Sequence, residues 1–243
     1  MCGIFGILSS NTRHFENVDE QLYKIIHRGP DEQGKWQGNG VFLGNCRLSI
    51  IDLAGGHQPM FNEDKTRCIV YNGELYNFLD LRPELEKRGY SFRTKSDTEV
   101  VLHAYEEWGF DCLKRFNGMF AFAVWDDRKK LLFIARDRIG EKPLYYYQGN
   151  KALIFSSEIK SIVADPLVPR VVNPRGLANY LAFGHALAPD TMYQDIFKLL
   201  PGHYLVAQNG QVETKQYWDV GDEPVEAANE HLSEHEYAER ILA

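Results

Sequence analysis

The sequence lacks any apolar run long enough to cross a membrane, and it lacks an excess of positive charge. Its 243 residues carry 27 Lys and Arg against 34 Asp and Glu, which gives a formal net charge of −7. A membrane-spanning helix needs roughly 18 or more consecutive apolar residues, and no run approaches that length. The acidic balance does not favour binding to nucleic acid or to anionic lipid. We therefore expect neither nucleic acid nor membrane as a partner.

Cysteine is scarce, and internal repeats and low-complexity tracts are missing. The four cysteines (Cys2, Cys46, Cys68 and Cys112) are far apart and form no C-x-x-C pair. Residues 3–8 are apolar, but no basic region precedes them, so the start does not resemble a secretory signal. Cys46, Cys68 and Cys112 are therefore predicted to be reduced core thiols, and the protein to be cytoplasmic. The 44% of hydrophobic residues is ample for a folded core.

The pattern of turns and apolar residues predicts antiparallel strands combined with helices. Asn39-Gly40, Gly149-Asn150 and Asn209-Gly210 are typical turns of three β-hairpins. Further strands are predicted at residues 3–8, 67–71, 118–125 and 131–135, with a short one at 90–93. Residues 118–125 are almost continuously apolar, which is typical of a strand buried on both faces. Many hairpins grouped with helices favour an α+β fold over a parallel βαβ sheet.

Helices are predicted where a capping residue precedes apolar positions at helical spacing. The predicted starts are Asn17 or Asp19, Asp80 with Pro83 in the first turn, Ser96 or Asp97, and Asn173-Pro174. The strand of residues 41–43 is expected to run on toward Asp52. Residues 221–229 indicate a linker, and residues 233–236 (SEHE) have the pattern of a capping box that begins another helix.

Cys2 is the residue most suited to carry chemistry. If Met1 is removed, Cys2 becomes the first residue and bears both a thiol and a free α-amine. An N-terminal residue whose own amine acts as base is one way to activate a nucleophile. Unperturbed pKa values of about 7.7–8.0 for the amine and about 8.5 for the thiol allow both to exchange protons near neutrality. By position alone, however, a small buried hydrophobe is the more common role of such a cysteine.

Other residues would suit a cysteine that attacks the amide of an amino acid. Asn72-Gly73 can offer a side-chain amide and a backbone N–H to an oxyanion, although an Asn-Gly pair by itself is more typical of a turn. Arg47 can pair with an α-carboxylate, and Asp97 and Glu74 with an α-ammonium. A surface charge is the alternative for Arg47, and a helix N-cap is the alternative for Asp97. The residues alone indicate a cysteine hydrolase without a defined substrate.

Nine motifs, in order, give the sequence its resemblance to a known family. They are residues 1–6 (MCGIFG), 27–31 (HRGPD), 47–52 (RLSIID), 71–77 (YNGELYN), 96–99 (SDTE), 117–122 (NGMFAF), 135–140 (ARDRIG), 142–146 (KPLYY) and 156–160 (SSEIK). From residue 1 to about 218, the chain resembles the class II (N-terminal nucleophile) glutamine amidotransferase domain. The resemblance is closest to the asparagine synthetase branch of that family.

The resemblance implies a four-layer αββα sandwich of two antiparallel sheets, and it implies roles for the site residues. Cys2 would attack the side-chain amide of glutamine, and Asn72 and Gly73 would hold the oxyanion. Arg47 would bind the glutamine α-carboxylate, while Asp97 and Glu74 would hold its ammonium end. The other predicted glutamine-binding residues are Leu48, Ser49, Ile50 and Ile51. Water would then release glutamate from the thioester.

The sequence contains no Ser-Gly-Gly-x-Asp-Ser pyrophosphate loop and no Walker-type loop. The resemblance implies that residues 1–218 form the amidotransferase domain and that residues 219–243 are a linker with the first helix of a synthetase domain outside this chain. ATP and Mg are expected only in that domain. No cofactor and no metal are expected here, because His231 and His235 lack a third ligand. The expected partners are L-glutamine and the synthetase domain or subunit, and a homodimer is left open.

The resemblance thus predicts a glutaminase that supplies ammonia for the amidation of aspartate to asparagine. Two alternative functions remain. The same domain could serve a different ammonia acceptor, such as a peptide, a sugar or an antibiotic precursor. It could also be a non-catalytic regulatory module that binds glutamine without hydrolysing it.

Overall fold

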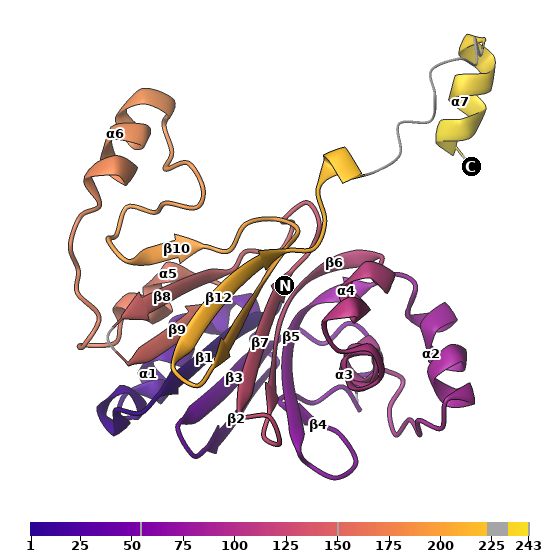
Figure 1. Ribbon diagram of the computed structural model, residues 1–243, viewed down its shortest axis with the longest axis horizontal. Helices are drawn as coiled ribbons and strands as arrows, with labels where there is room; N and C mark the ends of the chain where they lie inside the picture. The colour runs from indigo at the N-terminus through magenta and orange to yellow at the C-terminus, as the bar shows by residue number, and fades with distance from the viewer. Residues whose placement is uncertain (54, 150, 223–232, 243) are drawn as a thin grey trace.

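The computed structural model describes residues 1–53, 55–149, 151–222 and 233–242. Two six-stranded antiparallel sheets lie face to face (Figure 1). The first has the strand order β10-β8-β9-β1-β3-β2, and the second β12-β11-β7-β6-β5-β4. The strands of the first are β1 (Gly3–Ser9), β2 (Glu32–Gly38), β3 (Val41–Arg47), β8 (Tyr145–Gly149), β9 (Ala152–Ser156) and β10 (Ile196–Lys198). Those of the second are β4 (Met60–Phe61), β5 (Arg67–Leu75), β6 (Gly118–Asp126), β7 (Leu131–Arg136), β11 (His203–Gln208) and β12 (Gln211–Gln216).

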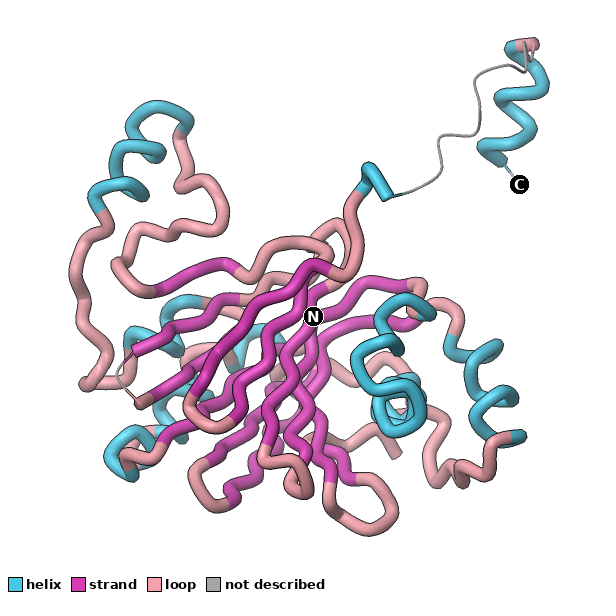
Figure 2. Tube along the Cα trace, viewed as in Figure 1, coloured by secondary structure: helices cyan, strands magenta, loops and turns pink. Residues whose placement is uncertain are grey.

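Helices α1 to α5 cover the outer faces of the sheets, whereas α6 projects away from the first sheet (Figure 2). The α-helices are α1 (Val18–Tyr23), α2 (Phe78–Lys87), α3 (Asp97–Trp108), α4 (Cys112–Arg115), α5 (Ile159–Val163), α6 (Pro174–Phe183) and α7 (Glu234–Leu242), and the 3₁₀ turns are η1 (Thr12–Phe15), η2 (Ile26–Arg28), η3 (Gly109–Asp111) and η4 (Val220–Asp222). Among the described residues, no helix is long and apolar enough to span a bilayer.

Three apolar layers hold the sandwich together, and their order confirms the predicted αββα architecture. Ile4 and Val70 belong to the layer between the sheets. Leu22 of α1 and Ile162 of α5 pack on the outer face of the first sheet. Tyr105 of α3 packs on the outer face of the second sheet. In the described chain each sheet therefore lies between its partner sheet and a helical layer.

Strand β6 shows why the apolar run at residues 118–125 predicted burial on both faces. Phe120 and Phe122 lie in the layer under α3, whereas Ala121 and Ala123 lie between the sheets. Successive side chains of a strand point to opposite faces, so a strand covered on both sides needs apolar residues at every position.

Two strand boundaries differ from the prediction. Strand β5 continues past Tyr71 to Leu75, and its register places Asn72 opposite Ala121 and Gly73 opposite Phe120. Asn72-Gly73 is therefore part of a strand and not a turn. Strand β3 ends at Arg47 and does not continue toward Asp52. Residues 90–93 do not form a strand, so that prediction was wrong.

The buried carboxylate of Glu99 explains why residues 90–93 do not form a strand. The N–H groups of Arg93 and Thr94 donate to Glu99 at 2.9 and 2.7 Å, so a side chain of α3 satisfies them and not a neighbouring strand. Such local bonds compete with sheet formation.

The start of α2 was also predicted wrongly, because the helix begins after Asn77 and contains Pro83 in its interior. Asn77 is fixed by a distant segment: its Nδ2 donates to Arg115 O at 2.9 Å, and its Oδ1 accepts from the N–H of Asn117 at 3.0 Å. Asp80 therefore lies in the first turn and does not precede it. The residues that set this boundary are about forty positions apart in the sequence, so a pattern of neighbouring residues does not predict it.

Other helix starts follow the predicted capping residues. Asn17 immediately precedes α1, although that helix ends at Tyr23 and gives way to η2. Ser96 caps α3, and Asn173 caps α6 with Pro174 in the first helical position. The capping box of Ser233 and Glu236 is present at the start of α7. Asn150 of the second predicted hairpin turn, residues 223–229 of the predicted linker and His231 lie outside the described residues.

Candidate active site

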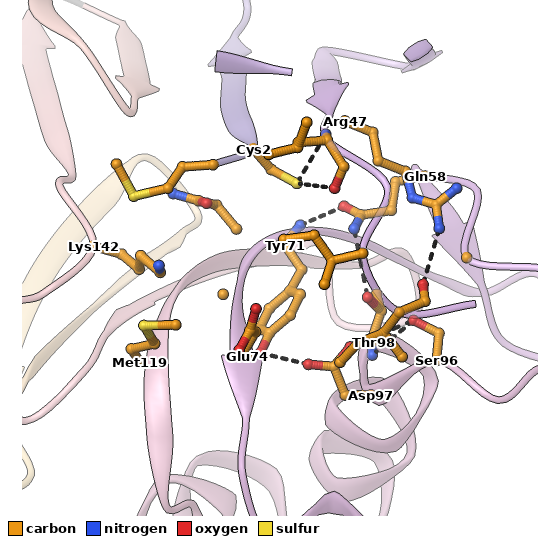
Figure 3. A pocket seen from close by; sticks show the side chains of 17 residues that line it. Cys2, Arg47, Gln58, Tyr71, Glu74, Ser96, Asp97, Thr98, Met119 and Lys142 are labelled. Carbon is orange, nitrogen blue, oxygen red and sulfur yellow. Dashed lines mark hydrogen bonds between the residues drawn. The ribbon is translucent and has the colours of Figure 1, made fainter. Parts of the chain in front are cut away.

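Cys2, Asn72 and Asp97 come from three separate elements and line one pocket (Figure 3). Cys2 immediately precedes β1, Asn72 belongs to β5, and Asp97 is the first residue of α3. Asn45 Nδ2 of β3 donates to Tyr71 O of β5 at 3.3 Å and so joins the two sheets next to the pocket. The full lining is Met1, Cys2, Arg47, Leu48, Ile50, Ile51, Gly56, Gln58, Tyr71, Asn72, Gly73, Glu74, Ser96, Asp97, Thr98, Met119 and Lys142. Every predicted site residue except Ser49 is in this set.

The Cys2 thiol lies against the chain just after β3. Its Sγ is 3.5 Å from Leu48 O, and the N–H of Leu48 donates to Sγ at 3.4 Å. Burial raises the pKa of the Cys2 thiol, and the Leu48 N–H only partly opposes that rise. The thiol is thus mostly protonated at neutral pH, and it needs a base before it can attack.

Met1 is still attached to Cys2 in this structure. The Cys2 nitrogen is therefore part of a peptide bond and cannot accept the thiol proton. Met1 is 57% exposed, so the residue that must be removed to free the amine lies at the surface.

The other three cysteines are free and buried, as predicted. Burial raises the pKa of Cys46 to about 11, although the side chain of Gln33 donates to its sulfur. Burial likewise raises the pKa of Cys68 and Cys112. Among the cysteines, all of which are described, Cys2 alone lines the pocket.

Asn72, which lines the pocket, has an unused hydrogen-bond donor. The residue is 1% exposed, and its Nδ2 has no hydrogen-bond partner among the described residues. A buried donor without a partner costs about 1–3 kcal/mol. A ligand atom that accepts from Nδ2 would recover that free energy.

Gly73 has a packing role in addition to the predicted one. A Cβ at this position would lie 2.3 Å from Met119 O, a contact that the paired strands β5 and β6 could not accommodate. Glycine is therefore required by the close approach of the two backbones, whatever its role toward a substrate.

Asp97 is buried and held by donors from neighbouring elements. Its Oδ2 accepts from Tyr71 Oη and from the N–H of Leu75, each at 3.0 Å. Burial raises the pKa of the Asp97 carboxyl, while these donors oppose the rise. Ser96, and not Asp97, is the N-cap of α3, so the capping alternative for Asp97 was wrong.

Arg47 is 4% exposed, so the surface-charge alternative was wrong. Its Nη2 donates to Asp52 O at 2.7 Å and to Ile51 O at 3.1 Å, and its Nη1 donates to Glu32 at 3.3 Å. The guanidinium therefore holds the loop that follows β3.

Ser49 lies outside the pocket lining, and its N–H donates to Asp31 at 2.9 Å. This contact ties the loop after β3 to the turn at residues 28–31. Its predicted role in binding glutamine stays a prediction. Leu48, Ile50, Ile51 and Glu74 all border the pocket, with Ile50 61% exposed at its rim.

Sequence reasoning missed Gln58, which links two walls of the pocket. Its Oε1 accepts from the N–H of Tyr71 at 2.6 Å, and its Nε2 donates to Thr98 Oγ1 at 3.4 Å (Figure 3). Nothing in the loop at residues 55–59 signals this role, because both partners are distant in sequence.

Lys142 was missed as well. It is 6% exposed and lies with Met119 on the side of the pocket away from Gln58 (Figure 3). Asp137 shapes its loop by accepting from the N–H groups of Lys142 at 3.0 Å and Glu141 at 2.9 Å. The available signal was a lysine in the short segment between Gly140 and the strand that begins at Tyr145. In the sequence, that segment was used only as one of the motifs of the family resemblance.

No group of three or more His, Cys, Asp or Glu side chains suited to a metal ion occurs within the described ranges. The pocket instead combines a thiol, an unpaired amide donor, a buried carboxylate and a guanidinium. Such a set suits an uncharged acyl carbon at one end of a ligand and a zwitterionic amino-acid group at the other.

Comparisons with known proteins agree with this arrangement. A family model described as glutamine amidotransferase domain matches residues 1–218. The chain is 41% identical over 229 residues to asparagine synthetase [glutamine-hydrolyzing] 3 of Bacillus subtilis (strain 168), covering 92% of the chain and 37% of the relative. It is 37% identical over 239 residues to asparagine synthetase [glutamine-hydrolyzing] 1 of the same organism, covering 96% and 38%.

A solved structure of glutamine phosphoribosylpyrophosphate amidotransferase from B. subtilis superposes with a TM-score of 0.62 at 20% identity. The match covers 89% of this chain and 49% of that one, and it shows a shared fold. The chain spans little more than a third of the length of the two asparagine synthetases. Over the part that it does span, motif order, fold and family model agree, and the chain belongs to the glutamine amidotransferase domain family.

Proposed function

We propose that this domain hydrolyses glutamine to glutamate and ammonia, with Cys2 as nucleophile after removal of Met1. The observation that carries the proposal is the unpartnered Asn72 amide, buried in the same pocket as the Cys2 thiol. In a water-excluded site, a donor already in place stabilises developing negative charge without reorganising.

The reaction needs one base and one oxyanion site. The free α-amine of Cys2 takes the thiol proton as Sγ bonds to the glutamine amide carbon, and Asn72 with Gly73 holds the oxyanion. As the C–N bond breaks, the amine passes its proton to the departing ammonia. Water then attacks the γ-glutamyl thioester, which gives glutamate and restores the thiol.

Three charged residues of the pocket bind the amino-acid end of the substrate. Arg47 pairs with the α-carboxylate, while Asp97 and Glu74 face the α-ammonium. Leu48, Ile50 and Ile51 line the space between these groups and Cys2.

The direct test combines two measurements on the purified chain. Intact mass should show loss of Met1, and a coupled assay should detect glutamate and ammonia in equal amounts from glutamine. A chain that begins at Cys2, binds glutamine by calorimetry and releases no ammonia would instead support the non-catalytic alternative.

Arg47→Lys should raise the KM for glutamine by about 10–100-fold and change kcat less, because lysine cannot form a bidentate pair with a carboxylate. Initial rates over a range of glutamine concentrations provide the measurement, with Arg13→Lys on η1 as the matched control. An unchanged KM would remove Arg47 from substrate binding.

The ammonia is proposed to serve a synthetase domain or subunit that amidates aspartate with ATP and Mg in the cytoplasm. Support comes from the two relatives, whose names state asparagine synthesis and whose chains are much longer than this one. The described helix α6 leaves Tyr180, Leu181 and Phe183 at least half exposed, which suits a surface that another domain covers. Delivery to a different acceptor is the less favoured alternative.

A further inference from the structure

The backbone of Cys2 is held by an arginine outside the pocket lining. Arg28 Nε donates to Cys2 O at 3.0 Å. Gly3 makes this approach possible, since a Cβ there would lie 3.3 Å from Arg28 Cδ and 3.0 Å from Ile25 Cδ1. After loss of Met1, Cys2 is joined to the rest of the chain only through its carbonyl carbon. The direction of the Cys2 carbonyl then fixes how both groups face the pocket.

Arg28 is itself held by Glu158. Its Nη1 donates to Glu158 Oε1 at 3.0 Å, and the Arg28 side chain is 10% exposed. His27 Nε2 reaches the same carboxylate oxygen at 2.9 Å, and Lys160 Nζ reaches the other at 2.9 Å. Burial alone would raise the pKa of Glu158, but hydrogen bonds from Arg28, Lys160 and His27 lower it to about 2.

The segment that carries Glu158 is locked onto β1. Ser157 Oγ accepts from the N–H of Ile4 at 3.0 Å, and the N–H of Ser157 donates to Ile4 O at 2.9 Å. Glu158 therefore has a fixed position next to the start of β1, yet it is not in the lining of the described pocket.

From this chain of contacts we infer that Glu158 is a positioning residue for the nucleophile, acting through Arg28 on the Cys2 carbonyl. The inference rests on the proposed glutaminase function. If Glu158 loses its charge, Arg28 keeps a nearly buried guanidinium without its counter-ion, and its Nη2 already has no partner among the described residues. The guanidinium then shifts toward solvent and releases the carbonyl.

The experiment compares Glu158→Gln, Glu158→Asp and the parent chain, each with Met1 removed. We expect Glu158→Gln to lower kcat for glutamine by at least about tenfold and to change KM by less than about twofold, because the nucleophile is displaced while the binding groups stay in place. Glu158→Asp keeps the charge and should recover part of kcat. Glu84→Gln is the matched control, since Glu84, like Glu158, accepts hydrogen bonds from basic side chains (Arg88 and Arg115, each at 3.2 Å) but lies on α2, away from Cys2.

A second readout does not depend on glutamine turnover. The rate at which iodoacetamide alkylates Cys2, followed by mass spectrometry, reports how well the amine can deprotonate the thiol. Glu158→Gln should slow this rate by at least about threefold relative to the parent and to Glu84→Gln. A parent chain that is inactive on glutamine would defeat the proposed function, while the alkylation rates would still decide the role of Glu158.

Coupling to Arg28 completes the test. In an Arg28→Ala background, Glu158→Gln should change the alkylation rate by less than about twofold, because the two residues act in series. Independent, additive losses from the two substitutions would overturn the inference. So would an unchanged kcat and alkylation rate in Glu158→Gln.

Discussion

Cys2→Ala should reduce glutamine hydrolysis by at least about a thousandfold, to the rate of the assay without enzyme. The substitution removes the sulfur that forms the thioester, and no other thiol can replace it. Cys46, Cys68 and Cys112 are buried, and burial raises the pKa of each. Ammonia release measured with the mature chain gives the result.

The matched control is Cys68→Ala, which removes a buried thiol from the layer between the sheets. It should lower stability while leaving kcat close to that of the parent. If Cys2→Ala retained a tenth of the parent rate, as a rough threshold, covalent catalysis by Cys2 would be excluded. Glutamine binding to Cys2→Ala, measured by calorimetry, should persist, because Arg47 and Asp97 are untouched.

Asn72→Asp is the second large expected effect, with a fall in kcat of about 10²–10³-fold and a smaller change in KM. The substitution keeps the shape of the side chain but replaces the Nδ2 donor with an oxygen that repels an oxyanion. Since Nδ2 has no partner among the described residues, no protein hydrogen bond to it is lost. Steady-state kinetics on glutamine test this prediction.

Asn77→Asp provides the comparison, because Asn77 is another asparagine with structural contacts, to Arg115 and Asn117. It should lose stability at the start of α2 and keep kcat. A kcat for Asn72→Asp within about threefold of the parent would show that the oxyanion is held elsewhere.

Turn chemistry and side-chain periodicity made much of the fold predictable. Asn39-Gly40 and Asn209-Gly210 are turns because their residues accept positive φ, which Asn209 and both glycines adopt. The apolar run at residues 118–125 predicted a strand covered on both faces. These features depend on neighbours a few positions apart, so the sequence alone contains them.

Errors occurred where a specific hydrogen bond or strand pairing outweighs a local preference. Asn72-Gly73 has turn chemistry, yet pairing with β6 holds it in a strand. The start of α2 is set by Arg115 and Asn117, and at residues 90–93 the N–H of Arg93 donates to Glu99 instead of to a neighbouring strand. For Asn72-Gly73 and for α2, the deciding contact joins residues that no local window compares, whereas the bond from Arg93 to Glu99 is local and competes with sheet formation.

The sequence by itself determined the reactive groups, because a thiol, an amide and a carboxylate are properties of single residues and their order matched a family. Only the tertiary structure decided that β1, β5 and α3 bring Cys2, Asn72 and Asp97 to one pocket. It also added Gln58 and Lys142, and it placed Glu158 behind Arg28 and Cys2. Burial and distance are set by packing across the whole chain, and they turn separate residues into a site.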